Sequence, residues 1–394
     1  MSRLGGAKTV MTALLLGLLA AAPAAADVRT AVTVEALLAG LSDPDGGMLL
    51  GAGGSARLDL AATGNRNVRG QLSLRAELRQ EAGDDDAAMS GGKVAGGKVA
   101  GVEVERAFLR ARLPGFRLTA GKTRLAWGQG RFFNAGDILF GQSAAFAAGA
   151  GEFLTAAEWL VAAYVPLGRL SFLELVALPP LHPLGIERTD AGGRAVVRVG
   201  ELTVEGGYLY AAARASDAER HEREHRAYLS LKGAVAGVDW HLSGGTALPG
   251  AAGVDLRRAA GQGLFLTGGG LAFLDLGPEA GVVTVLLEAG VRPWRAWNDA
   301  TPAPEAALDH YGVYLFPELS YRPADVWNLS LSGVVSPVDG SGVAAAGASW
   351  NIHQGLTLGL YTAVMLGERE DTFALERPGG VSATLLARYV FGSS

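Results

Sequence analysis

Apolar and polar residues alternate along most of the chain after residue 27. In the segment 68–80, even positions from 68 to 78 carry Val, Gly, Leu, Leu, Ala and Leu, whereas odd positions carry Arg, Gln, Ser, Arg, Glu and Arg. The segments 327–335 and 381–391 repeat the same alternation. A period of two predicts β-strands that have one apolar face and one polar face.

The connections between these strands alternate between short and long. Because lipid offers no hydrogen-bond partner to the backbone, a membrane-spanning sheet must close on itself, and its outward face must be apolar. Short turns at one end and long loops at the other are typical of such outer-membrane barrels. The short turns lie near 63–67, 114–115, 166–168, 199–200, 276–279, 322–325 and 353–354, and the long connections near 82–100, 128–153, 179–190, 213–224, 248–260, 293–308 and 367–379.

The strand count follows from the position of the termini. The pattern gives strands from Met48 to a final one at 380–391, and this set leaves the N-terminus outside the cell. Bacterial barrels have an even number of strands with both termini in the periplasm. The segment 28–38 supplies the missing strand. We therefore predict an all-β, antiparallel, up-and-down transmembrane β-barrel of 18 strands, with 16 as the alternative.

The first 26 residues have the layout of an export signal. Arg3 and Lys8 precede an apolar run at 10–22, and three alanines at 24–26 provide small residues for cleavage. This order is typical of a secretory signal peptide. We predict a signal peptide at 1–26, a barrel domain at 27–394, and a location in the cell outer membrane.

The composition excludes several classes of protein. The 394 residues include no cysteine, which excludes disulfide scaffolds and iron–sulfur clusters. The 39 acidic residues outnumber the 34 Lys and Arg, a balance that argues against a nucleic-acid-binding protein. The run His221–His225 matches the H-E-x-x-H zinc pattern, but it lies in a charged loop and not on an amphipathic helix. We expect no metal, no cofactor and no catalytic residue.

Aromatic residues near strand ends are typical of the lipid interface, where amphipathic rings lie at headgroup level. The candidates are Tyr208, Tyr228, Trp240, Tyr311, Tyr321, Trp327, Trp350, Tyr389 and Phe391.

With this pattern of strands and loops, the chain resembles Gram-negative outer-membrane porin-type proteins. Its last strand is similar to the assembly signal of that class, an alternating segment that ends in an aromatic residue, although Gly392 and two serines follow Phe391. The resemblance implies that the barrel-assembly machinery binds this strand. The segment 121–130, followed by Asn134 and Asp137, is similar to a G-[KR]-x-x-x-x-W-G segment of capsule-assembly and polysaccharide-export barrels.

A basic segment is the first candidate for function. Residues 66–131 contain 13 Lys and Arg but 7 Asp and Glu, although the whole chain is acidic. Rings of Arg and Lys in a pore select anions. Alternatively, these side chains pair with acids across the lumen. The predicted pore-lining residues are Arg69, Arg75, Arg79, Arg106, Arg110, Arg112, Arg117, Lys122 and Arg124.

The connection 128–153 is the second candidate. It is the third and longest of the outside loops, and it contains bulky residues followed by a tail of small ones. A loop of this kind folds inward and narrows the pore, or else it lies on the extracellular rim. For the first case, we predict Arg131, Phe133, Asp137 and Glu152 as constriction residues, with the two acids facing the arginines.

The sequence favours a porin-like channel for passive diffusion of small hydrophilic solutes, with anionic solutes preferred. One alternative is a plugged barrel that acts as a surface-polysaccharide anchor, an export protein or an adhesin. A less favoured one is an outer-membrane hydrolase. The expected partners are outer-membrane lipid, the barrel-assembly machinery and small hydrophilic solutes. Nucleic acid is not expected, and further copies of the chain stay an open alternative.

Overall fold

The computed structural model describes residues 27–42, 48–79, 98–139, 157–180, 189–212, 223–249, 263–278, 280–292, 312–323, 326–353, 355–368 and 380–392. The predicted signal peptide at 1–26 lies outside these residues. Within them, no helix is long and apolar enough to cross a membrane.

Eighteen strands follow one another along the described chain. They are β1 (Asp27–Ser42), β2 (Met48–Asn65), β3 (Val68–Arg79), β4 (Lys98–Leu113), β5 (Phe116–Thr123), β6 (Glu158–Pro166), β7 (Phe172–Leu178), β8 (Asp190–Val199), β9 (Leu202–Ala212), β10 (Arg223–Val235), β11 (Val238–Pro249), β12 (Phe265–Asp275), β13 (Val282–Val291), β14 (Val313–Arg322), β15 (Trp327–Val335), β16 (Gly342–His353), β17 (Leu356–Leu366) and β18 (Val381–Gly392).

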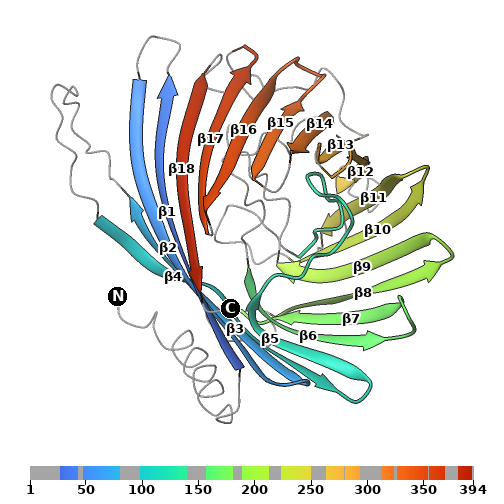
Figure 1. Cartoon of the computed structure of the whole chain (residues 1–394). Coiled ribbons are helices and arrows are strands. Elements are labelled where there is room, and N and C mark those ends of the chain that lie inside the picture. The colour runs from blue at the N-terminus through green and yellow to red at the C-terminus, as the bar shows by residue number, and fades with distance from the viewer. Residues whose placement is uncertain are drawn as a thin grey trace.

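The strands close into one antiparallel barrel. Each strand pairs with its neighbours in sequence, and β1 pairs with β18 from Ala31 opposite Gly392 to Ser42 opposite Val381. Figure 1 shows the strands as a ring in chain order, with both ends of the sheet joined. The predicted fold class and the strand number of 18 are confirmed.

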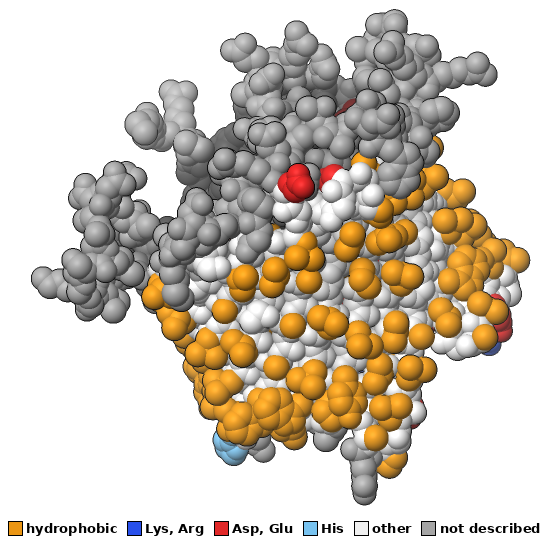
Figure 2. Space-filling model, turned by 90° about the horizontal axis from the view of Figure 1, so that it is seen from above, with side chains coloured by type: hydrophobic (Ala, Val, Ile, Leu, Met, Phe, Trp, Pro, Cys, Tyr) orange, Lys and Arg blue, Asp and Glu red, His pale blue; other side chains and the backbone are white. Residues whose placement is uncertain are grey.

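The outer wall is apolar, as contact with lipid requires. Leu229, Leu287 and Leu331 are each 55% exposed, and they alternate with residues that point into the barrel. Figure 2 shows hydrophobic side chains spread over the visible face of the wall. In water such a surface would be unfavourable, whereas in a membrane it faces acyl chains. The barrel is therefore built for an outer membrane.

Aromatic rings mark the periplasmic edge of this wall. Trp327 and Trp350 stack with centroids 5.4 Å apart, and Tyr389 and Phe391 are exposed on β18. The interface prediction is wrong for Tyr228, which points inward and is buried. Its hydroxyl needs a polar partner inside the barrel, and it finds one in a glutamate. The predicted Tyr311 lies outside the described residues.

The two-residue turn between β10 and β11 shows why the periplasmic turns are so short. Ala236 and Gly237 have positive φ angles of 51° and 80°, and the flanking residues pair directly. Two central residues with positive φ match the right-handed twist of the paired strands. Glycine accepts this conformation without steric cost, so the chain reverses in two residues.

Candidate pore and its inward segment

The chain leaves the wall after β5 and enters the barrel. We call residues 124–139 the inward segment. Figure 1 shows it in teal inside the ring of strands, away from β5. Trp127 and Phe133 of this segment are 0% and 2% exposed. A connection at this end of the barrel thus packs against the inner wall.

Three buried glutamates of the wall hold the inward segment. Glu174 on β7 accepts a hydrogen bond from Trp127 Nε1 at 2.9 Å. Glu205 on β9 accepts bonds from the Gly128 amide at 2.9 Å and from Gln129 Nε2 at 2.5 Å. Hydrogen bonds to charged acceptors are the stronger kind. These carboxylates therefore fix the first part of the segment.

Glu288 on β13 holds the middle of the segment through its backbone. Its Oε1 accepts a bond from the amide of Arg131 at 2.7 Å, and its Oε2 accepts bonds from the amides of Phe132 and Phe133 at 2.6 and 2.8 Å. The side chain is 1% exposed. Successive backbone N–H groups that converge in this way form an anion-binding nest, and here a wall carboxylate fills it.

Two arginines bind carbonyl groups of the inward segment. Arg194 Nη1 donates to the carbonyl oxygen of Ala126 at 2.7 Å, and Arg226 Nη1 donates to that of Ile138 at 3.1 Å. Arg194 also bridges Glu174 and Glu205, at 2.9 Å to each. The buried carboxylates are thus neutralised by a cation, which lowers the cost of placing them in the wall.

Aromatic packing holds the tip of the segment against β12 and β14. Phe132 stacks on Phe316 with centroids 3.9 Å apart, and Phe133 contacts Tyr314 at 5.8 Å and Phe265 at 6.5 Å. The segment therefore reaches from β7 to β14 along the inner wall.

The W-G motif shapes this segment. Gly128 has φ +79°, and a Cβ there would lie 2.1 Å from Asn134 Oδ1. Asn134 closes the turn: its Nδ2 donates to the Trp127 carbonyl at 2.8 Å, and its Oδ1 accepts from the Gly136 amide at 3.0 Å. Asp137 binds Arg124 at 2.7 Å. The motif residues thus build the segment and attach it to the wall.

Three of the four predicted constriction residues belong to the inward segment. Arg131 is exposed and its Nη2 is 3.3 Å from Glu318 on β14, whereas Phe133 packs into the wall. Asp137 is buried and pairs with Arg124, one of the predicted pore-lining arginines, within the inward segment. Glu152 lies outside the described residues.

Part of the predicted basic wall is neutralised by adjacent acids. Arg75 pairs with Glu77 and Glu105 at 3.3 Å each, and Arg57 on β2 pairs with Glu105 at 3.1 Å. Lys122 Nζ is 3.1 Å from Glu103. The register places Lys122 directly opposite Ala107 and Trp159, and because faces alternate along β5, Lys122 is on the other face of the strand from Arg117 and Thr119. The side chain of Arg79 lies outside the part of the chain that the structure describes.

Five other arginines have no carboxylate within ion-pair distance among the described residues. Arg69 lies directly opposite Arg110, and Arg112 lies directly opposite Arg117. Arg110 Nε donates to the hydroxyl of Thr119 at 3.4 Å, and Arg117 lies 4.2 Å over the ring of Tyr164. We call the set the arginine row; its members are Arg69, Arg106, Arg110, Arg112 and Arg117.

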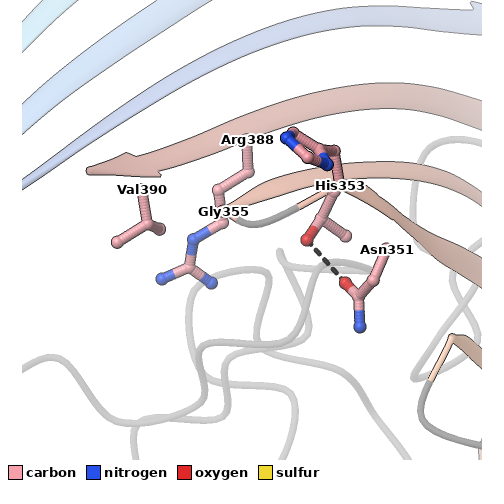
Figure 3. Close-up of a pocket in the computed structure, with 6 residues that line it drawn as sticks. Asn351, His353, Gly355, Arg388 and Val390 are labelled. Carbon is pink, nitrogen blue, oxygen red and sulfur yellow. Dashed lines mark hydrogen bonds between the residues drawn. The ribbon is translucent and has the colours of Figure 1, made fainter.

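A pocket of about 470 Å³ lies at the periplasmic end, between β16, β17 and β18. Figure 3 shows Asn351, His353 and Arg388 around it. The hydroxyl of Thr357 donates to Asn351 Oδ1 at 2.7 Å, and Arg388 Nε lies 3.4 Å from Glu35 on β1. The lumen is therefore lined by charged and polar groups at this end as well.

The zinc-like pattern does not form a helical metal site in the described part. Arg223, Glu224 and His225 belong to β10, so the prediction of a loop is wrong for these three residues. His221 and Glu222 lie outside the described residues. Nowhere in the described ranges do three or more potential metal-ligating side chains gather.

Solved structures with the same architecture include a porin. OccK8 (OprE) of Pseudomonas aeruginosa superposes with a TM-score of 0.55 at 9% identity, over 93% of this chain and 99% of that one. OccK3 (OpdO) of the same species gives 0.54 at 10%, over 93% and 96%. A BenF-like porin of Pseudomonas fluorescens Pf-5 gives 0.53 at 10%, over 93% and 99%. The fold is that of a Gram-negative outer-membrane porin.

This porin-type barrel has no detectable relative by sequence in two further comparisons. No protein-family model matches the chain, and no curated protein sequence is significantly similar to it. At about a tenth identity, the solved porins share the fold with this chain, and the residues of its lumen must be interpreted on their own chemistry.

Proposed function

We propose that the protein is a passive outer-membrane channel for small hydrophilic solutes that favours anionic ones. The observation that carries the proposal is the arginine row on β3, β4 and β5. Arginine in a pore attracts anions and binds carboxylate or phosphate through two parallel hydrogen bonds. A solved barrel of the same fold, described as a BenF-like porin, supports the channel assignment.

The inward segment sets the width of the passage in this proposal. Its contacts lie on one side of the barrel, from Glu174 on β7 to Phe316 on β14. The arginine row lies on β3, β4 and β5, outside this contact range. A solute therefore passes between the segment and the basic wall.

The wall formed by β18, β1 and the strands that follow also contains alternating charges. Arg388 contacts Glu35, and Arg57 contacts Asp59 and Glu105. Such a polar lining replaces part of the hydration of a passing solute. The arginines without acidic partners then give the passage its sign of selectivity.

Liposome swelling tests the channel itself. We expect vesicles that contain the refolded barrel to swell in isosmotic solutions of small neutral sugars and small carboxylates, and more slowly as solute size increases. Vesicles with heat-denatured protein are the control. Equal swelling rates for the folded and denatured samples would contradict the proposal and favour the plugged barrel, an anchor or export protein for surface polysaccharide.

We further propose that the last strand guides assembly. Tyr389 and Phe391 are exposed to lipid on β18, and Gly392 still pairs with Ala31 of β1. The aromatic signal is thus available on the strand that closes the barrel, and Gly392 extends the pairing by one position beyond Phe391.

A further inference from the structure

We propose that the outer wall at β9 and β10 binds a phosphate group of lipid A in the outer leaflet. The site consists of Arg223, His225, Tyr208 and Tyr210. This inference rests on the membrane-facing fold and is independent of conduction through the lumen.

These four side chains belong to the lipid-facing side of their strands. Tyr208 and Tyr210 are 45% and 38% exposed, whereas Leu209 between them is 1% exposed and packs inside the barrel. On β10, Tyr228 points inward to Glu205 and Leu229 is exposed. Because faces alternate, Arg223 and His225 share the outward face with Leu229.

The site lies at the extracellular end of the barrel. β9 begins after the short turn at 200–201 and ends at Ala212, and the long connection to β10 follows. Long connections mark the extracellular side of such barrels. Arg223 is the first residue of β10, so it lies at headgroup level. Leu229, roughly 20 Å further along the strand, lies at acyl-chain depth.

The four side chains contact one another and form a polar group. Contact between such a group and lipid tails alone would be unfavourable. The hydroxyl of Tyr208 is 2.6 Å from His225 Nδ1, and the rings of Tyr210 and His225 are 5.0 Å apart. The guanidinium of Arg223 lies 5.2 Å over the ring of Tyr210. Polar groups on a lipid-facing wall are costly unless they meet headgroups.

The chemistry of the group fits a phosphate. When the hydroxyl of Tyr208 donates to Nδ1, the imidazole of His225 keeps its N–H donor on Nε2. Arg223 supplies guanidinium N–H donors, and Asp190, 2.8 Å from its Nη1, balances its charge and orients it, so the group offers hydrogen-bond donors to a phosphate and no net positive charge. Basic groups at a membrane surface recognise anionic headgroups. Lipid A is an anionic lipid of the leaflet that this end of the barrel faces.

Native mass spectrometry of the refolded barrel in detergent tests the site. We expect diphosphorylated lipid A to bind the wild type, and Arg223→Gln with His225→Phe to weaken binding about fivefold or more, in line with the worth of a basic residue near a charged lipid surface. The control is Arg169→Gln with His353→Phe, which removes the same groups at the periplasmic end. The control should bind like the wild type.

A conservative variant, a folding control and other lipids distinguish the possible outcomes. Arg223→Lys keeps the charge and should retain most of the binding, and heat-modifiable migration shows that each variant is folded. Equal binding by the double variant would overturn the proposal. So would equal binding of dephosphorylated lipid A or of phosphatidylglycerol to the wild type. A dimer that the double variant loses would show that a second copy occupies this wall.

Discussion

Glu288→Ala should detach the inward segment from β13. The substitution leaves the amides of Arg131, Phe132 and Phe133 without their acceptor, and hydrogen bonds to charged groups contribute about 1.5–3 kcal/mol each. We expect these three amides to exchange with deuterium at least about tenfold faster, since 1.4 kcal/mol is a factor of ten. Single-channel conductance should rise by about a factor of two as the passage widens.

Glu318→Ala is the matched control for this variant. It removes a carboxylate that pairs with Arg131 of the same segment, but that arginine is exposed, with 58% of its side chain accessible. Exposed ion pairs contribute little. Both exchange and conductance should stay close to the wild type. If Glu288→Ala and Glu318→Ala have equal effects, the wall carboxylate at β13 does not hold the segment.

The second large effect is expected in the arginine row. Arg110→Gln with Arg117→Gln removes two positive charges for which no described carboxylate is a partner. The local potential then becomes less positive, so the anion-to-cation permeability ratio should fall about threefold or more. The reversal potential in asymmetric potassium chloride measures this ratio.

The control keeps the net charge of the lumen constant. Arg57→Gln with Glu105→Gln removes one cation and one anion that lie 3.1 Å apart. Its reversal potential should match that of the wild type. An unchanged reversal potential in the arginine double variant would show that the arginine row does not set selectivity. The alternative, in which basic side chains of the wall are neutralised by acids, would then apply to these residues as well.

The architecture was predictable because lipid imposes a simple rule on the sequence. An apolar residue at every second position and a short turn at every second connection leave a traceable pattern, and the need for an even strand number supplied β1. The argument that aromatic residues near strand ends lie at the lipid interface misplaced Tyr228. Its position in the alternation is inward, and its partner Glu205 lies on the neighbouring strand, a pairing that depends on register.

The site was only partly predictable. The basic segment at 66–131 was visible as a local charge excess, but which arginines are neutralised depends on the register and on a bulge at Glu105 in β4. Glu174, Glu205 and Glu288 were missed as anchors because they are far apart in sequence. One signal was present: each is the only charged residue of its strand, a placement that is costly unless a partner is buried with it.

The most direct test of the channel is single-channel recording of the refolded mature protein in a planar bilayer, with the reversal potential measured in asymmetric salt. The proposed function predicts stable ohmic steps and a reversal potential on the anion-selective side. A folded, heat-modifiable barrel that produces no steps would contradict a passive channel, and steps with cation preference would contradict the role of the arginine row.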